Sequence, residues 1–531
     1  MTTGIELYDT TLRDGTQMEG ISLSVEDKLK IARKLDELGV HYIEGGYPGS
    51  NPKDIEFFAR AGELNLKNAR LAAFGSTRRA GGRADTDPNL KALVEAGTPV
   101  VTIVGKAHDR HVTHILETTL EENLAMLGDS IRFLKQHGLT AFLDAEHFFD
   151  GFDSDSAYAL QCLKTAAGAG ADCVILCDTN GGAMTSRVAE VVRTVVSEVN
   201  CPIGIHTHNG AEVAVASSIA AVEAGAAHVQ GAANGYGDMC GNANMFSIIA
   251  NLKLKLGLDV VSDEQIERLT DVSNYITEIA NLPPNPRQAY VGSNAFSHKA
   301  GLHVSGVMKE DWSYQHIAPA RVGNVNRFVV SELAGISNVV KKLQERGIEV
   351  SLDQAKAIRD HVKKKEAQGW QYEGAEASFE LLVRRMLGDY SPPFEITSHK
   401  ITVEPGRNID PLTGDREYIA GVRATVLIRK DGREWKGHAD HQGVGPVDAL
   451  DKALRSAIVG HYPGLAALKL TDFKVHIVDS HHSTEALTRV LIESAAGEFT
   501  WWTVGISRNI IEASLLALVD SYEYWFLQFE K

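Results

Sequence analysis

Residues 5–45 read IELYDTTLRDGTQMEGISLSVEDKLKIARKLDELGVHYIEG and contain a complete unit of strand, helix and strand. The short apolar runs at 5–10 and 40–45 are predicted strands, and the amphipathic stretch between them is a predicted helix. Two strands joined by such a helix lie parallel through a right-handed crossover. This stretch therefore indicates the α/β class.

The helix of this unit has recognisable ends and one apolar face. Ser24 is a preferred N-cap residue, Asp27 lies at the acidic position of a capping box, and Gly39 is expected to end the helix. Apolar residues spaced by three and four predict the face that packs on the sheet: Val25, Leu29, Ala32, Leu35 and Leu38. The basic side chains of the helix are expected to be solvated: Lys28, Lys30, Arg33 and Lys34.

The same unit recurs along the first 257 residues. Eight short apolar runs alternate with helical stretches, at residues 5–10, 40–45, 71–75, 100–105, 140–146, 173–178, 203–208 and 227–232. Eight units in about 250 residues are the size of a (β/α)8 barrel. We therefore predict a TIM barrel over residues 1–260.

The pattern changes after the barrel. Residues 263–281 form a predicted helix stopped by prolines, and 331–388 are mainly helical, so 261–388 is a predicted linker or cover subdomain. Strands are predicted at 400–404, 418–429 and 473–478, and helices at 448–459 and 483–495. Residues 389–531 are therefore expected to form a separate α+β domain.

Composition limits the class of protein. With 53 Lys and Arg against 69 Asp and Glu, the net charge is −16, which argues against nucleic-acid or anionic-membrane binding. No apolar run approaches the ~18 residues of a membrane-spanning helix. The N-terminus lacks signal-peptide features, and five Cys do not suggest a disulfide framework. We expect a cytoplasmic protein.

Polar residues gather where the predicted strands end, which is where catalytic groups of such barrels lie. His206 and His208 are two apart, so both imidazoles point to one face of the seventh strand. An isolated His-x-His is often structural, but this one stands beside other polar strand ends. With Asp14 it predicts a mixed oxygen and nitrogen metal site.

Other polar residues at the strand ends permit two interpretations each. Arg13 is either the partner of Asp14 in an ion pair or a fixed cation for a substrate oxyanion. Glu146 is either a general base or the partner of a barrel Arg or Lys. Thr179 either binds a substrate carboxylate or caps the turn after Asp178. Asn242 is either a metal ligand or a helix cap.

Residues outside this set carry weaker signals. Cys173 and Cys177 are expected in the core, and Cys240 lies in a glycine loop where a redox role is a minor alternative. His303 and Tyr314 follow the barrel and are either surface residues or part of a proton-transfer element over its mouth.

Five motifs together resemble the acyl-CoA condensing enzymes that include 2-isopropylmalate, homocitrate and citramalate synthases. They are LRDGTQ at 12–17, HTHN at 206–209, GNA at 241–243, FSHKAGLH at 296–303 and GVGPVDA at 443–449. Within the family, EGGYPGSNPK at 44–53 looks most like the citramalate-synthase branch. The resemblance spans nearly the whole chain.

The resemblance implies a metal-assisted condensation of acetyl-CoA with a 2-oxo acid, pyruvate for this branch. It implies a divalent metal, Mg or Mn with Zn as a possibility, on four ligands: Asp14, His206, His208 and Asn242. It gives Arg13, Gln17 and Thr179 to substrate binding. Proton transfer would fall to Glu146 and His303, supported by Tyr314, with Arg13 stabilising the oxyanion.

The resemblance also implies regulation and assembly. The C-terminal domain would bind an end-product amino acid, isoleucine for this branch, and the chain would form a homodimer in which the segment after one barrel covers the partner's active site. Three alternatives stay open: a 2-isopropylmalate synthase acting on 2-oxoisovalerate, an acyl-CoA lyase or aldolase of the same superfamily, and a non-catalytic amino-acid-binding protein.

Overall fold

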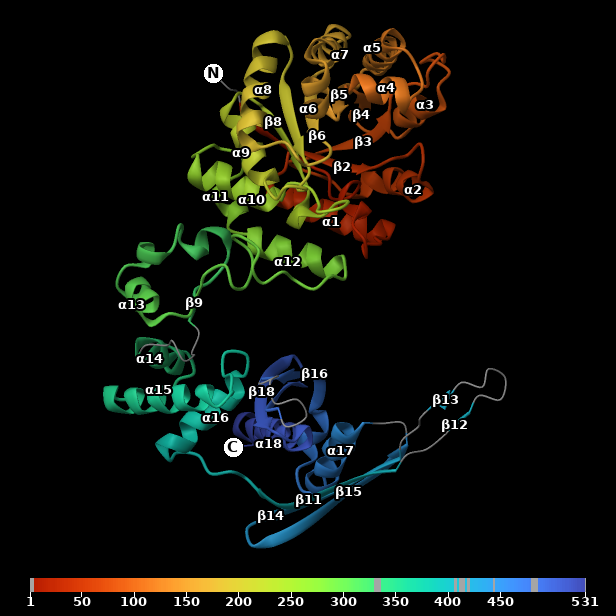
Figure 1. Ribbon diagram of the computed structural model, residues 1–531. Coiled ribbons are helices and arrows are strands. Elements are labelled where there is room, and N and C mark those ends of the chain that lie inside the picture. The colour runs from red at the N-terminus through yellow and green to blue at the C-terminus, as the bar shows by residue number, and fades with distance from the viewer. Residues whose placement is uncertain are drawn as a thin grey trace. The chain divides into compact units, whose positions relative to one another are not determined.

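The computed structural model describes residues 4–328, 336–404, 408–409, 416–417, 421–442, 445–478 and 486–530 (Figure 1). The chain forms two compact units. The first contains Met1–Phe296 and His316–Asn326, and the second contains Ser297–Gln315 and Arg327–Lys531. The predicted domain limits at 260 and 388 stay a prediction.

The first unit contains a closed barrel of eight parallel strands in sequential order, which confirms the predicted fold class. The strands are β1 (Glu6–Asp9), β2 (Tyr42–Gly46), β3 (Arg70–Ser76), β4 (Val100–Lys106), β5 (Thr140–Glu146), β6 (Cys173–Asp178), β7 (Ile203–Thr207) and β8 (His228–Gly231). Each coincides with one predicted run. The barrel closes where β1 pairs with β8, with Asp9 opposite Gly231.

Helices surround the barrel in Figure 1. They are α1 (Val25–Leu38), α2 (Pro52–Arg60), α3 (Pro88–Glu95), α4 (Asp109–His114), α5 (Leu120–Gln136), α6 (Phe148–Ser154), α7 (Ser156–Gly168), α8 (Thr185–Glu198), α9 (Ala214–Glu223) and α10 (Met245–Ala250). The main apolar core lies between these helices and the strands. A smaller cluster of inward-facing residues includes Tyr8, Phe142, Cys173 and Cys177, so both cysteines are core residues as predicted.

Helix α1 confirms its predicted ends but not its predicted solvated face. Ser24 and Asp27 form a reciprocal capping box, and Gly39 ends the helix in the left-handed region with φ 91°. Lys28, however, is only 3% exposed. Its ammonium group pairs with Asp54 in the first turn of α2 and donates to the carbonyl of Gly45 in β2 at 3.0 Å. The expectation that Lys28 is solvated is wrong.

After the barrel, the first unit contains two helices, α11 (Asp263–Ile266) and α12 (Leu269–Ile279), where one was predicted. The second unit begins with β9 (Ser297–His298), α13 (Gly301–Lys309) and β10 (Arg327–Phe328). Three helices then pack on their own apolar core: α14 (Ile336–Glu345), α15 (Leu352–Ala367) and α16 (Glu376–Leu387). The helical character predicted for this region is confirmed.

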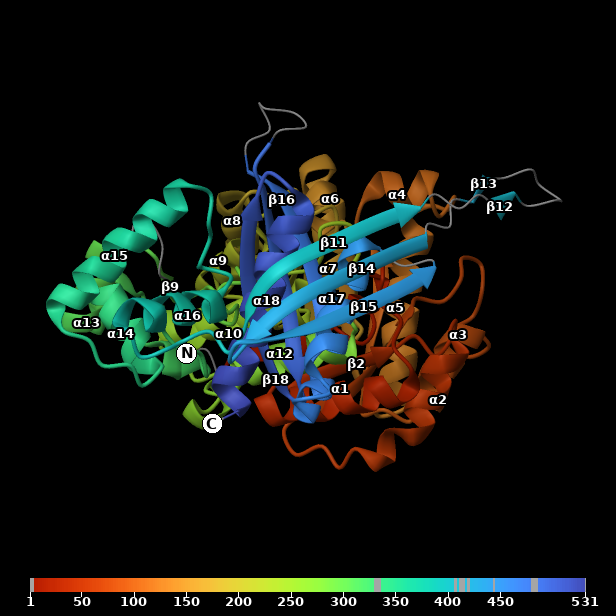
Figure 2. The ribbon, with the colours of Figure 1, turned by 90° about the horizontal axis from the view of Figure 1, so that it is seen from below.

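The rest of the second unit repeats three antiparallel strands followed by a helix. The first set is β11 (Glu395–Glu404), β14 (Gly421–Lys430), β15 (Arg433–Gln442) and α17 (Pro446–Ile458), with the short pair β12 (Asn408–Ile409) and β13 (Arg416–Glu417) between β11 and β14. The second set is β16 (Lys469–Ile477), β17 (Thr488–Ala496), β18 (Phe499–Ser507) and α18 (Ile510–Phe529). Figure 2 shows β11, β14 and β15 as neighbouring strands. This confirms the predicted α+β character.

One predicted helix of this region is a strand. Within residues 483–495, the part from Thr488 onward forms β17, the central strand of its sheet. Its alternate residues Val490 and Ile492 are fully buried, which is the two-residue period of a strand.

Parts of four predicted features lie outside the described residues: 331–335, 418–420, 443–444 and 483–485. None of the helices within the described ranges is both long and apolar enough to cross a membrane.

Candidate metal centre and active site

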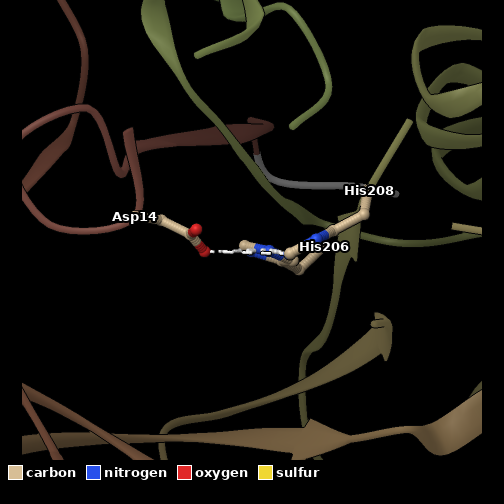
Figure 3. A group of neighbouring side chains, drawn as sticks. All are labelled: Asp14, His206 and His208. Atoms are coloured by element: carbon tan, nitrogen blue, oxygen red, sulfur yellow. Dashed lines mark hydrogen bonds and ion pairs between the residues drawn. The ribbon is translucent and has the colours of Figure 1, made fainter. Parts of the chain in front are cut away.

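Three predicted ligands meet at the carboxyl ends of the barrel strands (Figure 3). Asp14 follows β1, while His206 and His208 lie at the end of β7. The Asp14 carboxylate oxygen Oδ2 is 3.6 Å from His206 Nε2 and 3.8 Å from His208 Nε2. The two Nε2 atoms are 3.0 Å apart. One ligand atom from each residue lies within 4.8 Å of the others, a spacing suited to one metal ion.

Polar atoms without hydrogen-bond partners support this reading. Within the described part of the chain, Asp14 Oδ1 and Asn242 Oδ1 are buried and make no hydrogen bond. The Asn242 amide nitrogen donates to the carbonyl of Tyr236 at 3.1 Å, so the amide oxygen is the free atom. A backbone bridge also places Asn242 beside His208. These residues fit a divalent cation, because buried oxygens without donors are costly unless a cation binds them.

The charge state of the ligands suits a cation. Burial alone raises the pKa of Asp14, but the charges of Arg13, His206 and His208 outweigh this and lower it to about 2. Burial lowers the pKa of His206 to about 4, and the nearby charge of His208 acts in the same direction. At neutral pH the site therefore offers a carboxylate and a neutral imidazole, which are the ligating forms.

Two residues that were not predicted to belong to the site, Gln230 and Asp144, position the imidazole of His206. Its Nδ1 lies 2.7 Å from Gln230 Oε1, and Gln230 Nε2 donates to Asp144 Oδ1 at 3.0 Å. Because the amide oxygen of Gln230 accepts, the proton of the imidazole lies on Nδ1 and the lone pair of Nε2 faces Asp14. The only sequence signals are the polar residues inside the buried strands β5 and β8.

Arg13 is fixed beside the ligands. Its Nε donates to Glu44 at 2.5 Å and its Nη1 to Asp14 at 3.0 Å, so the predicted ion pair with Asp14 is present. The guanidinium also lies 3.9 Å above the centre of the Phe74 ring. Tyr8 donates to Glu44 at 2.8 Å and completes this support. The site thus contains a cation held in one position, as electrostatic stabilisation of an oxyanion requires.

Glu146 and Thr179 lie across the site from these groups. Glu146 forms an ion pair with Lys106 at the end of β4, so the predicted alternative of a barrel Arg or Lys partner is present. Thr179 Oγ1 accepts a hydrogen bond from the backbone N–H of His147 at 2.8 Å. The turn after β6 is capped by Asp178, which accepts from Gly182 and Ala183, so a capping role for Thr179 is wrong.

One cavity of about 300 Å³ brings most predicted residues together. Its lining includes seven of them: Arg13, Asp14, Gln17, Glu146, Thr179, His206 and His208. Phe74, Val104, Asp144 and Met239 also line it. A metal-ligand set, a fixed cation and a carboxylate therefore face one space large enough for a small substrate.

Two predicted residues belong to the second unit. His303 and Tyr314 stack with ring centres 4.3 Å apart. Their role in proton transfer stays a prediction. Cys240 is exposed and unbonded, and no feature of the described residues supports a redox role for it.

Three family models match the chain along its length. The HMGL-like model matches residues 4–276. The model described as homocitrate synthase post-HMGL domain-like matches 290–369, and that of the LeuA allosteric (dimerisation) domain matches 373–526. Together they cover the barrel, the helical region and the α+β repeat.

Three relatives, each named (R)-citramalate synthase, match over nearly their full length. Those of Geobacter sulfurreducens and Aquifex aeolicus are both 47% identical, over 98% and 99% of this chain and 97% and 98% of their own. That of Sulfolobus acidocaldarius is 42% identical over 100% of this chain and 98% of its own. This chain therefore belongs to the family of 2-isopropylmalate, homocitrate and citramalate synthases, with an HMGL-like barrel and a LeuA allosteric domain.

Proposed function

We propose that this protein condenses acetyl-CoA with pyruvate to give citramalate and CoA. The observation that carries the proposal is the convergence of Asp14, His206 and His208 with Arg13 and Glu146 on one cavity. A carbon–carbon condensation at a ketone requires these groups: ligands for a Lewis-acid metal, a cation for the developing oxyanion and a carboxylate for proton transfer. The relatives at 42–47% identity, all named (R)-citramalate synthase, support pyruvate as the acceptor.

The metal ligands in this proposal are Asp14, His206, His208 and Asn242, and the cation is Mg²⁺ or Mn²⁺. When bound, it supplies a Lewis acid for the keto oxygen and the carboxylate of the 2-oxo acid. Gln230 and Asp144 keep the lone pair of His206 Nε2 turned toward the cation. Arg13 faces the same cavity and stabilises the negative charge that develops on the keto oxygen.

The remaining residues bind the acceptor and move protons. Thr179 and Gln17 bind the substrate carboxylate. Glu146 and His303, with Tyr314 in support, are the groups proposed to remove a methyl proton from acetyl-CoA and to protonate the new alkoxide, and in the proposed homodimer His303 and Tyr314 act on the other chain's barrel. The methyl carbon forms a bond with the keto carbon, and water then cleaves the thioester to release CoA.

The C-terminal repeat is the regulatory part of this proposal. Its match to a LeuA allosteric (dimerisation) domain supports an oligomer with an effector site. We propose a homodimer and isoleucine as the effector. Titration of the protein with isoleucine, valine and leucine tests this, and inhibition by leucine alone would contradict it.

The activity is tested by CoA release with acetyl-CoA and Mg²⁺ or Mn²⁺. Pyruvate, 2-oxobutyrate, 2-oxoisovalerate and 2-oxoglutarate are compared at equal concentration, with the product identified by mass. We expect preference for pyruvate. Preference for 2-oxoisovalerate would make the protein a 2-isopropylmalate synthase, and cleavage of citramalyl-type thioesters without any condensation would make it a lyase.

A further inference from the structure

The loop after β8, residues 232–242, folds back around the amide of Asn242. The amide nitrogen Nδ2 donates to the carbonyl of Tyr236 at 3.1 Å, and a Cβ atom at Gly237 would overlap this nitrogen. Within the described part of the chain, Asn242 Oδ1 is buried and has no hydrogen-bond donor. Because a carbonyl only accepts, Tyr236 selects the orientation of the amide in which Nδ2 is used and Oδ1 stays available for a cation.

Asn234 lies in the first turn of this loop, in the left-handed region with φ 56° and ψ 7°. Among residues with a side chain, Asn is one of those that adopt this region most readily. Gly adopts it more easily still. The turn alone therefore does not explain why an amide side chain stands at this position.

The side chain of Asn234 ties the loop to α12 and to the segment that follows this helix. Oδ1 accepts from Ser273 Oγ at 2.6 Å and from Gln288 Nε2 at 2.8 Å. Nδ2 donates to the carbonyl of Ser273 at 3.2 Å and to Thr277 Oγ1 at 3.0 Å. Both polar atoms of the amide therefore bind groups that lie outside the loop.

Tyr236 connects Asn234 with Asn242. Its hydroxyl oxygen lies 3.1 Å from Asn234 Nδ2 and 3.1 Å from Thr277 Oγ1, while its carbonyl accepts from the Asn242 amide. Tyr236 is only 8% exposed. A buried residue bonded at its hydroxyl and at its carbonyl has little freedom to move, so a change at Asn234 reaches the Asn242 amide.

We propose that Asn234 is a positioning residue of the metal centre, which acts through Tyr236 to keep Asn242 Oδ1 in place for the cation. The inference rests on the proposed function, in which Asn242 is a metal ligand. The cavity with the metal ligands is lined by other residues of the same loop, Asp238 and Met239. Asn234 thus serves the ligand and not the substrate.

The first test is Mn²⁺ binding by Asn234→Gly, which keeps the left-handed turn and removes only the amide. Asn281→Gly is the matched control, because Asn281 is also left-handed, with φ 54°, and is exposed just after α12. Loss of contacts that support a ligand predicts a Kd for Mn²⁺ about tenfold higher in Asn234→Gly. Asn281→Gly is expected to stay within about twofold of the wild type, and an equal change in both variants would overturn the proposal.

A double-mutant cycle with Asn242→Ala separates positioning from a general structural role. Without the Asn242 amide there is no ligand left to orient, so adding Asn234→Gly is expected to change the Kd for Mn²⁺ by less than about twofold. A structural role predicts the same tenfold loss in both backgrounds. That additive result would overturn the proposal.

Tyr236→Phe tests the connection and serves if Asn234→Gly does not fold. It removes the hydroxyl contacts and keeps the carbonyl, so the Kd for Mn²⁺ is expected to rise about threefold to fivefold. An unchanged Kd in the folded variant would overturn the route through Tyr236. Thermal unfolding of each variant shows whether it is folded.

The single variant Asn242→Ala distinguishes failure of the inference from failure of the proposed function. Mn²⁺ affinity equal to wild type in Asn242→Ala would remove Asn242 from the proposed ligand set, and the inference with it. Weaker binding in Asn242→Ala but not in Asn234→Gly would overturn the inference alone. A loss in Asn234→Gly that disappears in the Asn242→Ala background would support it whichever 2-oxo acid the protein accepts.

Discussion

Replacement of Gln230 by Met is the sharpest test of how the barrel builds its metal centre. Met has nearly the length of Gln and no hydrogen-bonding amide, so it removes both contacts with little change in volume. The variant loses the hydrogen bond between His206 Nδ1 and Gln230 Oε1, 2.7 Å long, and the one from Gln230 Nε2 to Asp144 Oδ1, 3.0 Å long. His206 is only 4% exposed, so water does not replace the acceptor easily.

The expected effect is a loss of metal affinity. To bind a cation through Nε2, His206 must keep its proton on Nδ1, and in the variant this buried N–H has no acceptor. An unsatisfied buried donor costs about 1–3 kcal/mol, and loss of such supporting contacts typically lowers metal affinity by about 10- to 100-fold. A tenfold change equals about 1.4 kcal/mol, so the two estimates agree.

The assay is direct binding of Mn²⁺, followed by the electron paramagnetic resonance signal of the free ion, in parallel with calorimetry. Asn324→Leu is the matched control, because Asn324 is a buried amide whose bonds run to the carbonyls of Tyr290 and Gly292. Thermal unfolding of both variants shows that they are folded. Mn²⁺ affinity within twofold of wild type in folded Gln230→Met would refute the positioning role.

Three further predictions concern stability. Lys28→Met leaves a buried carboxylate unpaired and should lower the free energy of unfolding of the first unit in urea by about 3–5 kcal/mol, whereas Lys30→Met on the same helix should change it by less than about 0.5 kcal/mol. Gly505→Ala places a methyl carbon 1.9 Å from a backbone oxygen of α18, so it should destabilise the second unit by about 1–3 kcal/mol in the same assay. Its control is Gly460→Ala, because a methyl group there has no heavy atom within 4 Å. Burial lowers the pKa of His228, so below its ordinary value of 6.5 the unfolded state binds more protons than the folded state and stability falls with falling pH. In His228→Phe the loss of stability between pH 6.5 and pH 5 should be smaller by up to about 1.4 kcal/mol per pH unit. An unchanged dependence of the unfolding free energy on pH would contradict this.

The barrel was predictable because each of its strands is a short apolar run with its own helix, so local pattern and tertiary role agree. The metal ligands followed from the strand ends and the two-residue spacing of His206 and His208. The errors came where tertiary contacts decide. Residues 483–495 contain Val490 and Ile492 at strand spacing, but the surrounding Leu, Glu and Ala also suit a helix, and only the neighbouring strands on both sides fix the outcome. Lys28 is buried because the next helix of the barrel, α2, supplies Asp54.

The residues that position the metal ligands and Glu146 could not be predicted from the sequence for the same reason. Asp144, Gln230 and Lys106 lie on three different strands, and one sequence does not show which strands face each other across a barrel. Only their polarity within buried strands marks them. A polar residue in such a strand has a partner that must be found in space.

The supports also explain how one fold separates metal binding from substrate binding. Tyr8 and Glu44 hold Arg13 beside Asp14 from one side, and Asp144 and Gln230 hold His206 from the other. Apart from Arg13 and Asp14, these side chains lie on strands of the barrel, where the closed sheet fixes their positions. A neighbouring cavity of about 400 Å³, by contrast, is lined by Arg79 from the loop after β3 and by Leu116 from the loop between α4 and α5. Changes in those loops can therefore alter which substrate fits without moving the metal ligands. A change in the pair Tyr8 and Glu44, or in the pair Asp144 and Gln230, should instead lower the affinity for the metal ion before it alters substrate specificity.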